Sequence, residues 1–394
     1  MKDDLDDLIY WIWFSQIAEI GRIKTSEVLL EYGSPRILFE QIKASSAPKR
    51  FFKLFPKLVE SPGLGGAKAI LKNCRENGCE IITYADSLYP ERLRQIYSAP
   101  PLFYAKGNLD ILNELEQNGA ICVVGARGCV EYGVNVTREL TRGLAEAGVI
   151  TISGFAIGID AVVHEETLAV SGKTIAVLGC GIDVDYPQKN AELRKKMLQG
   201  NGLFLSEYPL QTKATKFSFP VRNRVMAGLS DGVLVTEANL ISGSLITANR
   251  CLDQGKDVFS VPHNVGSPGS EGCNKLLKDG AFVVTEVNDI LMELQNRYRD
   301  IELIAEKKKD SSVERLLGQN VEKSRDVGSI DLEDLIAGLS DGSKRVYSVL
   351  QSVPKELDFL VSELAMDLSD LLVSITELEL LGLIKTHPGS LYSI

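Results

Sequence analysis

The chain has 394 residues, carries a formal net charge of −10 and is 44% hydrophobic. This length exceeds one ordinary domain core, so we expect two or three domains, and the globular composition excludes wholesale disorder. An acidic chain is also unsuited to coating DNA in general, so any nucleic-acid site must be local.

Cysteine usage and the N-terminus predict a cytoplasmic location. The seven cysteines contain no Cys-x-x-Cys pair, which fits free thiols in a reducing compartment, and the acidic start Met-Lys-Asp-Asp lacks a signal pattern. No apolar run approaches the ~20 residues of a membrane helix, so we expect no membrane partner.

Residues 1–85 predict a helical domain. We expect helices over residues 5–19, 25–32, 34–43 and 66–77, with glycine in the turns between them. Short helices joined by glycine turns are typical of a helix-hairpin-helix element, whose turn amides can face a phosphate, and equally of plain helix packing.

Residues 86–295 alternate between strand and helix patterns after a proline-rich lead-in strand at 99–107. The strands are short continuous apolar runs, typical of strands buried on both faces, at 120–125, 149–153, 173–179, 203–206, 232–237, 257–261 and 281–285. Helices are expected at 134–147, 160–170, 190–199, 245–254 and 271–278. The fold class is therefore α/β, with a doubly wound, mostly parallel Rossmann-like sheet.

The last hundred residues predict a linker and a small domain. Residues 296–340 are polar and charge-dense, as linkers are, and residues 341–394 show three helices and a final hairpin, the outline of a winged helix. The third helix carries Asp370, Glu377 and Glu379 but no Lys or Arg. Contact with a protein partner or dimerisation is therefore at least as well supported there as binding to duplex DNA.

One segment of this acidic chain, residues 211–226, contains four cations and no carboxylate. Its cations are Lys213, Lys216, Arg222 and Arg224, and Phe217 and Phe219 lie among them. Single-stranded nucleic acid fits both properties, because bases stack on aromatic rings while cations follow the backbone. A solvated loop whose arginines form salt bridges fits as well.

The loops after three predicted strands carry groups suited to phosphate. They are Gly125 to Arg127, Ser153-Gly154, and Ser242-Gly243-Ser244 at a helix start. Glycines let backbone amides approach an anion, arginine offers a forked charge, and a helix N-terminus favours negative charge. Short strand-to-helix loops need glycine anyway, so the signal comes from three such loops at one sheet edge.

Several other activities lack their motifs. The Gly125 loop is not a Gly-x-Gly-x-x-Gly fingerprint, and the Ser242 loop lacks the Gly-Lys-Ser/Thr of a P-loop. The chain shows no nucleophile elbow and no carboxylate cluster suited to two metals. Asp160 and His164 lie four residues apart, and a structural hydrogen bond fits them better than a metal, because no third ligand is evident. We therefore expect no cofactor, no metal and no enzymatic activity.

Taken in order, these motifs resemble the DNA-processing protein A family (DprA, also called Smf), in its three-domain form. The matching segments span about residues 89–289: Tyr89-Pro90 with Pro100-Pro101, Val124-Gly-Ala-Arg127, Ser153-Gly154 with Gly158-Ile-Asp160, residues 172–183 with Tyr186-Pro187, Ser206-Glu-Tyr-Pro209, Phe219-Pro-Val-Arg-Asn-Arg224 and Ser242-Gly-Ser-Leu-Ile-Thr-Ala248. The helical domain and the winged helix also match.

The resemblance implies a cytoplasmic homodimer that binds single-stranded DNA and loads the RecA recombinase onto incoming DNA in natural transformation. It implies that Phe219 lies near a base, that the cations bind phosphates and that serine and glycine amides add neutral donors. The implied DNA-binding residues are Gly125, Arg127, Ser153, Gly154, Lys216, Phe219, Arg222, Asn223, Arg224, Ser242, Gly243 and Ser244.

Three positions depart from the family pattern. Ile157 stands where an arginine is usual, Val130 where a serine is common, and Val261-Pro-His-Asn-Val-Gly266 replaces Val-Pro-Gly. We expect binding to be retained but weaker, with a flatter salt dependence for each missing cation.

Two other interpretations stay open. Nucleoside-monophosphate phosphoribohydrolases share a similar sheet, but their later loop reads Pro-Gly-Gly-x-Gly-Thr with a catalytic Glu, whereas here Glu237 is followed by a loop containing Ile-Ser-Gly-Ser. A nucleotide-sensing or purely protein-interaction module is the other alternative.

Overall fold

The computed structural model describes residues 2–17, 24–44, 63–298, 301, 303–304, 339–350, 355–364, 366–380, 383–387 and 391–393. The chain forms two compact units, Met1–Glu306 and Lys307–Ile394. Most of the predicted linker at 296–340 lies outside the described residues.

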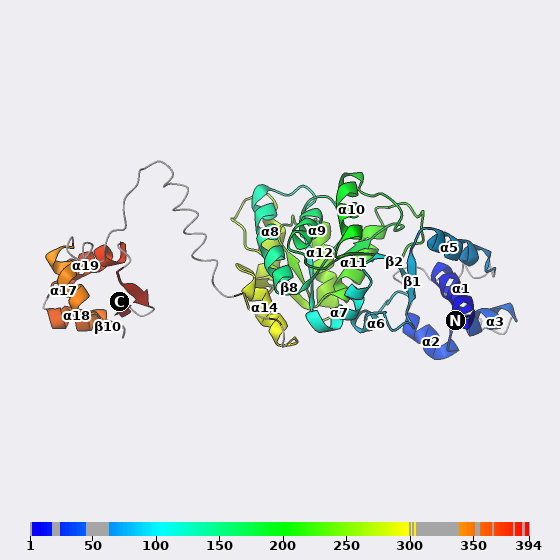
Figure 1. Ribbon diagram of the computed structural model, residues 1–394, viewed down its shortest axis with the longest axis horizontal. Helices are drawn as coiled ribbons and strands as arrows, with labels where there is room; N and C mark the ends of the chain where they lie inside the picture. Colours follow the sequence, from blue (N-terminus) through cyan, green and yellow to red (C-terminus); the bar gives the residue numbers. More distant parts are fainter. Residues whose placement is uncertain are drawn as a thin grey trace. The chain divides into compact units, whose positions relative to one another are not determined.

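A nine-stranded sheet forms the centre of the first unit (Figure 1). Its order is β1-β2-β6-β5-β4-β3-β7-β8-β9; the strands from β6 to β9 in this order are parallel, and β1 and β2 are antiparallel to their neighbours. The predicted doubly wound, mostly parallel sheet is confirmed. The strands are β1 Glu80–Thr83, β2 Leu102–Gly107, β3 Ala120–Val124, β4 Ile150–Ser153, β5 Thr174–Leu178, β6 Gly202–Ser206, β7 Gly232–Val235, β8 Asp257–Ser260 and β9 Phe282–Val283.

Alternate side chains of each central strand enter different cores, which explains their unbroken apolar sequences. In β3, Ile121 and Val123 pack on the face covered by α8 (Glu131–Glu146) and α9 (Ile159–Ala169). Cys122 and Val124 pack on the other face, against α11 (Ser218–Leu229) and α12 (Gly243–Asp253). Every residue of β3 is buried, as expected for a strand covered on both sides.

Several helices of the sheet region were not predicted, and α11 is the most consequential of them. The cationic segment is helical only from Ser218, where the largely buried α11 begins, while Lys213 and Lys216 precede the helix and are exposed. Pro220 lies in the first turn, where a missing N–H costs no intrahelical hydrogen bond. The remaining helices of the sheet region are α6 Glu91–Arg94, α7 Asp110–Asn118, the 3₁₀ turn Gln188–Asn190, α10 Ala191–Gln199, α13 Glu271–Lys278 and α14 Asn288–Gln295.

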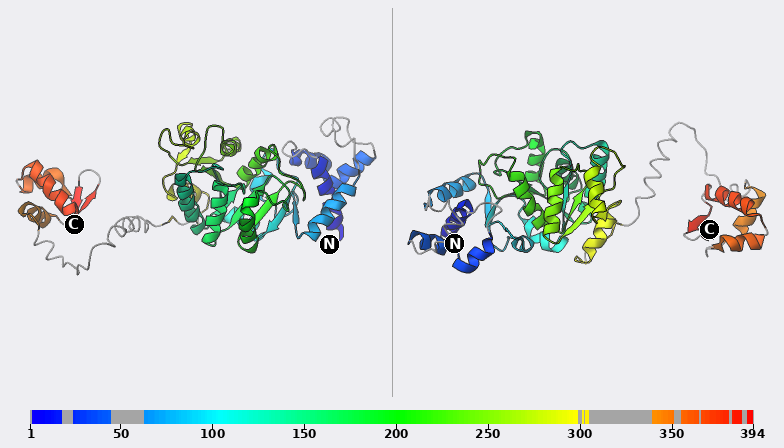
Figure 2. Two further views of the ribbon diagram at one scale, coloured as in Figure 1. Left: turned by 90° about the horizontal axis from the view of Figure 1, so that it is seen from above. Right: turned by 180° about the vertical axis from the view of Figure 1, so that it is seen from behind.

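The N-terminal helices lie beside the β1 and β2 edge of the sheet (Figure 1; Figure 2). They are α1 Lys2–Ile17, α2 Thr25–Tyr32, α3 Pro35–Lys43 and α5 Gly65–Glu76, close to the predicted ranges. Trp13 and Phe39 share one apolar cluster with Tyr104 and Phe204 of the sheet. The sheet itself begins at β1, ahead of residue 86.

The second unit is a winged helix, as predicted. Its elements are α17 Asp341–Val349, β10 Lys355–Glu356, α18 Leu357–Leu364, α19 Leu368–Leu380, β11 Lys385–His387 and β12 Leu391–Ser393. The three strands pair in the order β10-β12-β11. Val346, Leu360 and Leu378 are among the residues of its apolar core. The short strand β10 was not predicted.

Candidate functional site

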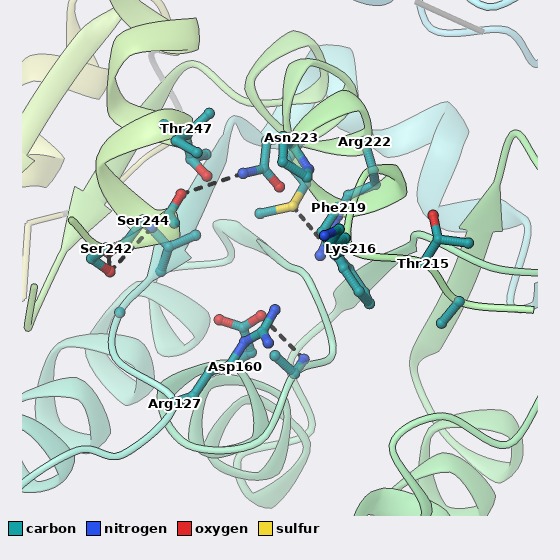
Figure 3. Close-up of a pocket in the computed structure, with 18 of the residues that line it drawn as sticks. Arg127, Asp160, Thr215, Lys216, Phe219, Arg222, Asn223, Ser242, Ser244 and Thr247 are labelled. Atoms are coloured by element: carbon teal, nitrogen blue, oxygen red, sulfur yellow. Dashed lines mark hydrogen bonds between the residues drawn. The ribbon is translucent and has the colours of Figure 1, made fainter.

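An open cleft of about 560 Å³ lies at the carboxyl ends of β3 and β7 (Figure 3). These neighbouring strands lead into helices on opposite faces of the sheet, so their loops diverge and leave a crevice, the usual ligand position in such folds. Gly125 and Arg127 line one side, and Ser242 to Ser244 line another. The start of α11 provides the third side.

The helical period of α11 decides which of its residues reach the cleft. Phe219, Arg222, Asn223 and Met226 are three, four and seven residues apart, so they share one face and line the cleft. Lys216 lines the cleft just before the helix begins and is exposed.

A charged aromatic surface faces this opening. The Arg127 guanidinium carbon lies 5.3 Å from the centroid of the Phe219 ring, within range of a cation–π interaction. Tyr186 lies on the same ring at 5.7 Å between centroids and is 41% exposed. Arg127 and Lys216 are both exposed, so their charges remain available to a ligand.

Two buried ionisable residues, Arg222 and Asp160, lie beneath this surface. Arg222 is 5% exposed, and its Nη1 donates to the Val177 carbonyl at 2.6 Å. The Asp160 carboxylate accepts the Ala156 N–H at 3.1 Å. Burial raises the pKa of Asp160 while the charge of Arg222 opposes that shift, and burial lowers the pKa of Arg222 while Asp160 opposes it.

The Ser242 loop forms the start of α12. The Ser242 hydroxyl accepts the Ser244 N–H at 3.3 Å, and the Asn223 side chain donates to the Gly243 carbonyl at 3.4 Å. Asn223 therefore ties α11 to this loop. A helix N-terminus held open beside two exposed cations favours an anionic ligand.

Three residues expected at the site are not brought into this cleft. The Ser153 hydroxyl is fully buried and donates to the Val123 carbonyl at 2.7 Å. Gly154 faces Arg222, where a Cβ would overlap the guanidinium, so this glycine makes room for that side chain.

Arg224 also lies elsewhere, because residues two apart on a helix point in different directions. It is 7% exposed, forms an ion pair with Glu207 and lines a different cleft from Arg222. The sequence placed Arg222 and Arg224 in one binding site because it did not predict the helix that separates their directions.

The site also contains residues to which the sequence assigned no function. Asp160 and Tyr186 were recognised as parts of motifs, but only the structure brings them to the cleft. Ile157 lines a smaller cavity of about 80 Å³ beside Arg127 and Phe219. An arginine at position 157 would therefore stand next to the cleft, which fits the expectation of a lost cation.

The predicted hydrogen bond between Asp160 and His164 was wrong. His164 instead bonds through Nδ1 to the Thr174 hydroxyl at 2.7 Å, and burial lowers its pKa to about 3. Within the described ranges, no cluster of three or more His, Cys, Asp or Glu could hold a metal ion.

Glu237, the carboxylate between β7 and the Ser242 loop, is 1% exposed and is not among the residues that line the cleft. Its two carboxylate oxygens accept the Val130 N–H at 3.0 and 3.3 Å, at the start of α8. The carboxylate therefore stabilises a helix start.

Two family models match the chain. "DNA recombination-mediator protein A" matches residues 80–295, and "DprA winged helix domain" matches residues 332–390. The chain belongs to the DprA/Smf family. The Smf protein of Synechocystis sp. is 30% identical over 393 residues, covering 97% of this chain and 98% of that protein. The DprA of Streptococcus pneumoniae is 42% identical over 210 residues, covering 53% of this chain and 72% of that protein.

Solved DprA structures share the fold. The X-ray structure from Streptococcus pneumoniae has a TM-score of 0.59 at 34% identity, over 72% of this chain and 96% of that one. The DprA of Helicobacter pylori, whose structure was studied for its single-stranded DNA binding mode, has a TM-score of 0.50 at 29% identity, over 56% and 97% of the respective chains. No helix in the described ranges is long and apolar enough to cross a membrane.

Proposed function

We propose that this DprA/Smf chain binds single-stranded DNA in the cleft at the ends of β3 and β7. The observation that carries the proposal is the exposed pair of cations, Arg127 and Lys216, beside the half-buried ring of Phe219. Cations follow a phosphate backbone, and an aromatic ring accepts any base by stacking. Of the other residues expected at the site, the proposal retains Gly125, Arg222, Asn223 and Ser242 to Ser244.

We propose binding without catalysis. Among the described residues that line the cleft, Asp160 is the one carboxylate, and it is 8% exposed beside Arg222. Glu237 already accepts a backbone N–H outside the cleft. A phosphoribohydrolase would release adenine from adenosine monophosphate, and measurable release would contradict this proposal.

We further propose that the chain loads RecA, in a cytoplasmic homodimer. The family model's description as a recombination mediator supports the first part. The strand β9 supports the homodimer, because it is an edge of the sheet formed by the described residues. Its Phe282 and Val283 are 43% and 54% exposed, and a second copy of the chain would cover them. RecA filament growth on single-stranded DNA, with and without the chain, measures the loading directly.

The fourfold division of the chain also remains our proposal: a helical domain, a Rossmann-like DNA-binding domain to residue 295, a linker and a winged helix from residue 341. We place β1 with the second of these, because it pairs with β2. Sedimentation and limited proteolysis would test the homodimer and these boundaries together.

Two phenylalanines provide the test of the DNA site. Phe219 lines the cleft, whereas Phe217 is 73% exposed and is not among the residues that line it. We expect Phe219→Ala to weaken binding of a labelled oligothymidine by about 1–3 kcal/mol, roughly 5- to 150-fold, and Phe217→Ala to change it far less. Fluorescence anisotropy gives the affinities, and circular dichroism checks that both variants fold. Equal losses in the two variants would refute the site.

A further inference from the structure

A second cleft, of about 810 Å³, lies on the other side of α11. Its walls are the turn after α6, the start of α11 and the end of α12. Among the described residues, four cations and one carboxylate line it: Arg92, Arg224, Arg250, Lys256 and Asp253. In a chain with a net charge of −10, this is a second local concentration of positive charge.

Two of these cations hold the wall together. The Lys256 ammonium donates to the carbonyls of Ala227, Gly228 and Ser230 at 2.6–2.8 Å, around the end of α11. Arg92 pairs with Asp231 at 2.9 Å. Both side chains already bind groups of the protein itself. They therefore add positive charge to the cleft but offer few free hydrogen-bond donors to a ligand.

The other two cations retain capacity to bind a ligand. The Arg250 side chain is 50% exposed, and its ion pair with Asp253, at 3.3 Å, is a surface pair of the weak kind. Arg224 binds Glu207 through Nη2, while its buried Nε and Nη1 have no hydrogen-bond partner among the described residues. Arg224 lines the cleft, and a buried guanidinium with unpaired donors is suited to a phosphate oxygen.

An exposed aromatic ring completes the second cleft. Tyr97 is 74% exposed and lines it. The Lys24 ammonium, which is paired with Glu27 at 2.5 Å, lies 4.4 Å from the centroid of this ring. Cations around an open aromatic ring are the combination already seen in the first cleft, where Arg127 lies against Phe219.

The two clefts meet at one residue. Pro220, in the first turn of α11, lines both of them, and the exposed Lys216 and Phe217 stand at the same helix start. A flexible anionic chain that leaves the first cleft therefore meets the second after passing over the start of α11. A single strand has this flexibility, whereas a stiff duplex does not.

We propose that single-stranded DNA continues from the first cleft over Pro220 into the second cleft. There Arg250 and Arg224 bind backbone phosphates, and Tyr97 stacks on a base. This inference rests on the proposed function, since it extends the same bound strand. It also gives Arg224 a role in DNA binding at a place different from Arg222.

Oligonucleotide length separates the two clefts. The full chain is titrated with labelled oligothymidines of about 6 and about 20 nucleotides, which bracket the about 4–16 nucleotides that one OB-fold holds. We expect Arg250→Ala to weaken binding of the long oligomer about 3- to 10-fold and to leave the short one unchanged. Arg250 suits this test because its ion pair with Asp253 lies on the surface, so its removal should not disturb the fold.

Arg138→Ala is the matched control. Arg138 lies on α8, its side chain is 45% exposed, and it pairs with Glu166, which also binds Arg142, away from both clefts. Arg138→Ala removes one positive charge, as Arg250→Ala does, but away from both clefts. It should therefore change the affinity for neither the short nor the long oligomer. Tyr97→Ala should repeat the length-dependent loss seen with Arg250→Ala.

The outcomes distinguish the two proposals. If neither oligomer binds, the proposed function fails and this inference falls with it. If both bind and Arg250→Ala behaves like Arg138→Ala for the long oligomer, the second cleft is refuted while the first stands. A loss for the short oligomer as large as for the long one would likewise refute a separate second cleft.

Discussion

At the scale of single residues, direction and burial decide which cations can bind a ligand. The sequence correctly identified a cationic segment with aromatic rings, but not which of its members are free. Lys216 is exposed, while Arg222 and Arg224 are 5% and 7% exposed and point to different sides of α11. Composition and spacing show which residue types are present. The direction of each side chain depends on α11, and the Phe-Pro sequence at its start hid this helix from sequence-based prediction.

His164 shows how burial changes a single group's chemistry. It is fully buried, and burial lowers its pKa from 6.5 to about 3. Below about pH 6.5 the unfolded chain takes up a proton that the folded chain does not, so stability is complete above that pH and declines as the pH falls towards 3. At about pH 4.5 the loss due to this group is about 3 kcal/mol.

A His164→Gln variant isolates this contribution, because the other titrating groups act equally in both proteins. We expect the free energy of unfolding to fall between about pH 7 and about pH 4.5 by about 3 kcal/mol more in the wild type than in the variant. Urea titrations followed by circular dichroism measure both. Equal losses would mean that His164 is charged in the folded protein.

At the scale of elements, the sequence predicted best where a segment has a clean apolar pattern. Its range for β4, 149–153, differs from Ile150–Ser153 by one residue, and α13 matches at both ends. The pattern failed for α11, whose buried arginines hide its apolar period, and for β1, whose pairing with β2 is a tertiary fact. Strand propensity alone cannot identify an antiparallel partner strand that lies 19 to 25 residues further along the chain.

The start of α8 depends on a carboxylate from another element. Glu237, after β7, accepts the Val130 N–H, and Gly133 in the first turn of α8 leaves space for that side chain. A Cβ at Gly133 would overlap the Glu237 carboxylate. Replacing a helical glycine by alanine usually stabilises by about 0.5–1 kcal/mol, but here we expect Gly133→Ala to destabilise by about 1–3 kcal/mol.

Gly65→Ala serves as the control for this change. Gly65 is the first residue of α5, and a Cβ there would meet nothing within 4 Å. We expect its unfolding free energy to equal or exceed that of the wild type. Thermal unfolding followed by circular dichroism compares the three proteins, and a Gly133→Ala variant as stable as Gly65→Ala would contradict this account of Glu237.

At the scale of the whole molecule, strand order creates the site. The sequence predicted phosphate-binding loops at one sheet edge, yet not that the β3 and β7 loops are neighbours. In the sheet, β3 lies directly beside β7, although three strands separate them along the chain. This order brings Arg127 opposite Ser242, and the long connection from β6 delivers Phe219 between them. The second cleft depends on α6 packing against α11, a contact between distant segments with no local sequence signal.

Binding of single-stranded DNA by this acidic chain depends, in our proposal, on the local positive charge of the first cleft. The salt dependence of oligothymidine binding tests this for the wild type, for Lys216→Ala, and for Lys195→Ala as a control. Lys195 is an exposed cation on α10, paired with Glu192 at 2.7 Å and absent from the lining of either cleft.

We predict that single strands bind more tightly than the matching duplex. A plot of the logarithm of the binding constant against the logarithm of the salt concentration should be a straight line. We expect its slope to be shallower by about 0.7 in Lys216→Ala and unchanged in Lys195→Ala. Equal slopes in the wild type and Lys216→Ala, or equal affinity for duplex and single strand, would contradict the account.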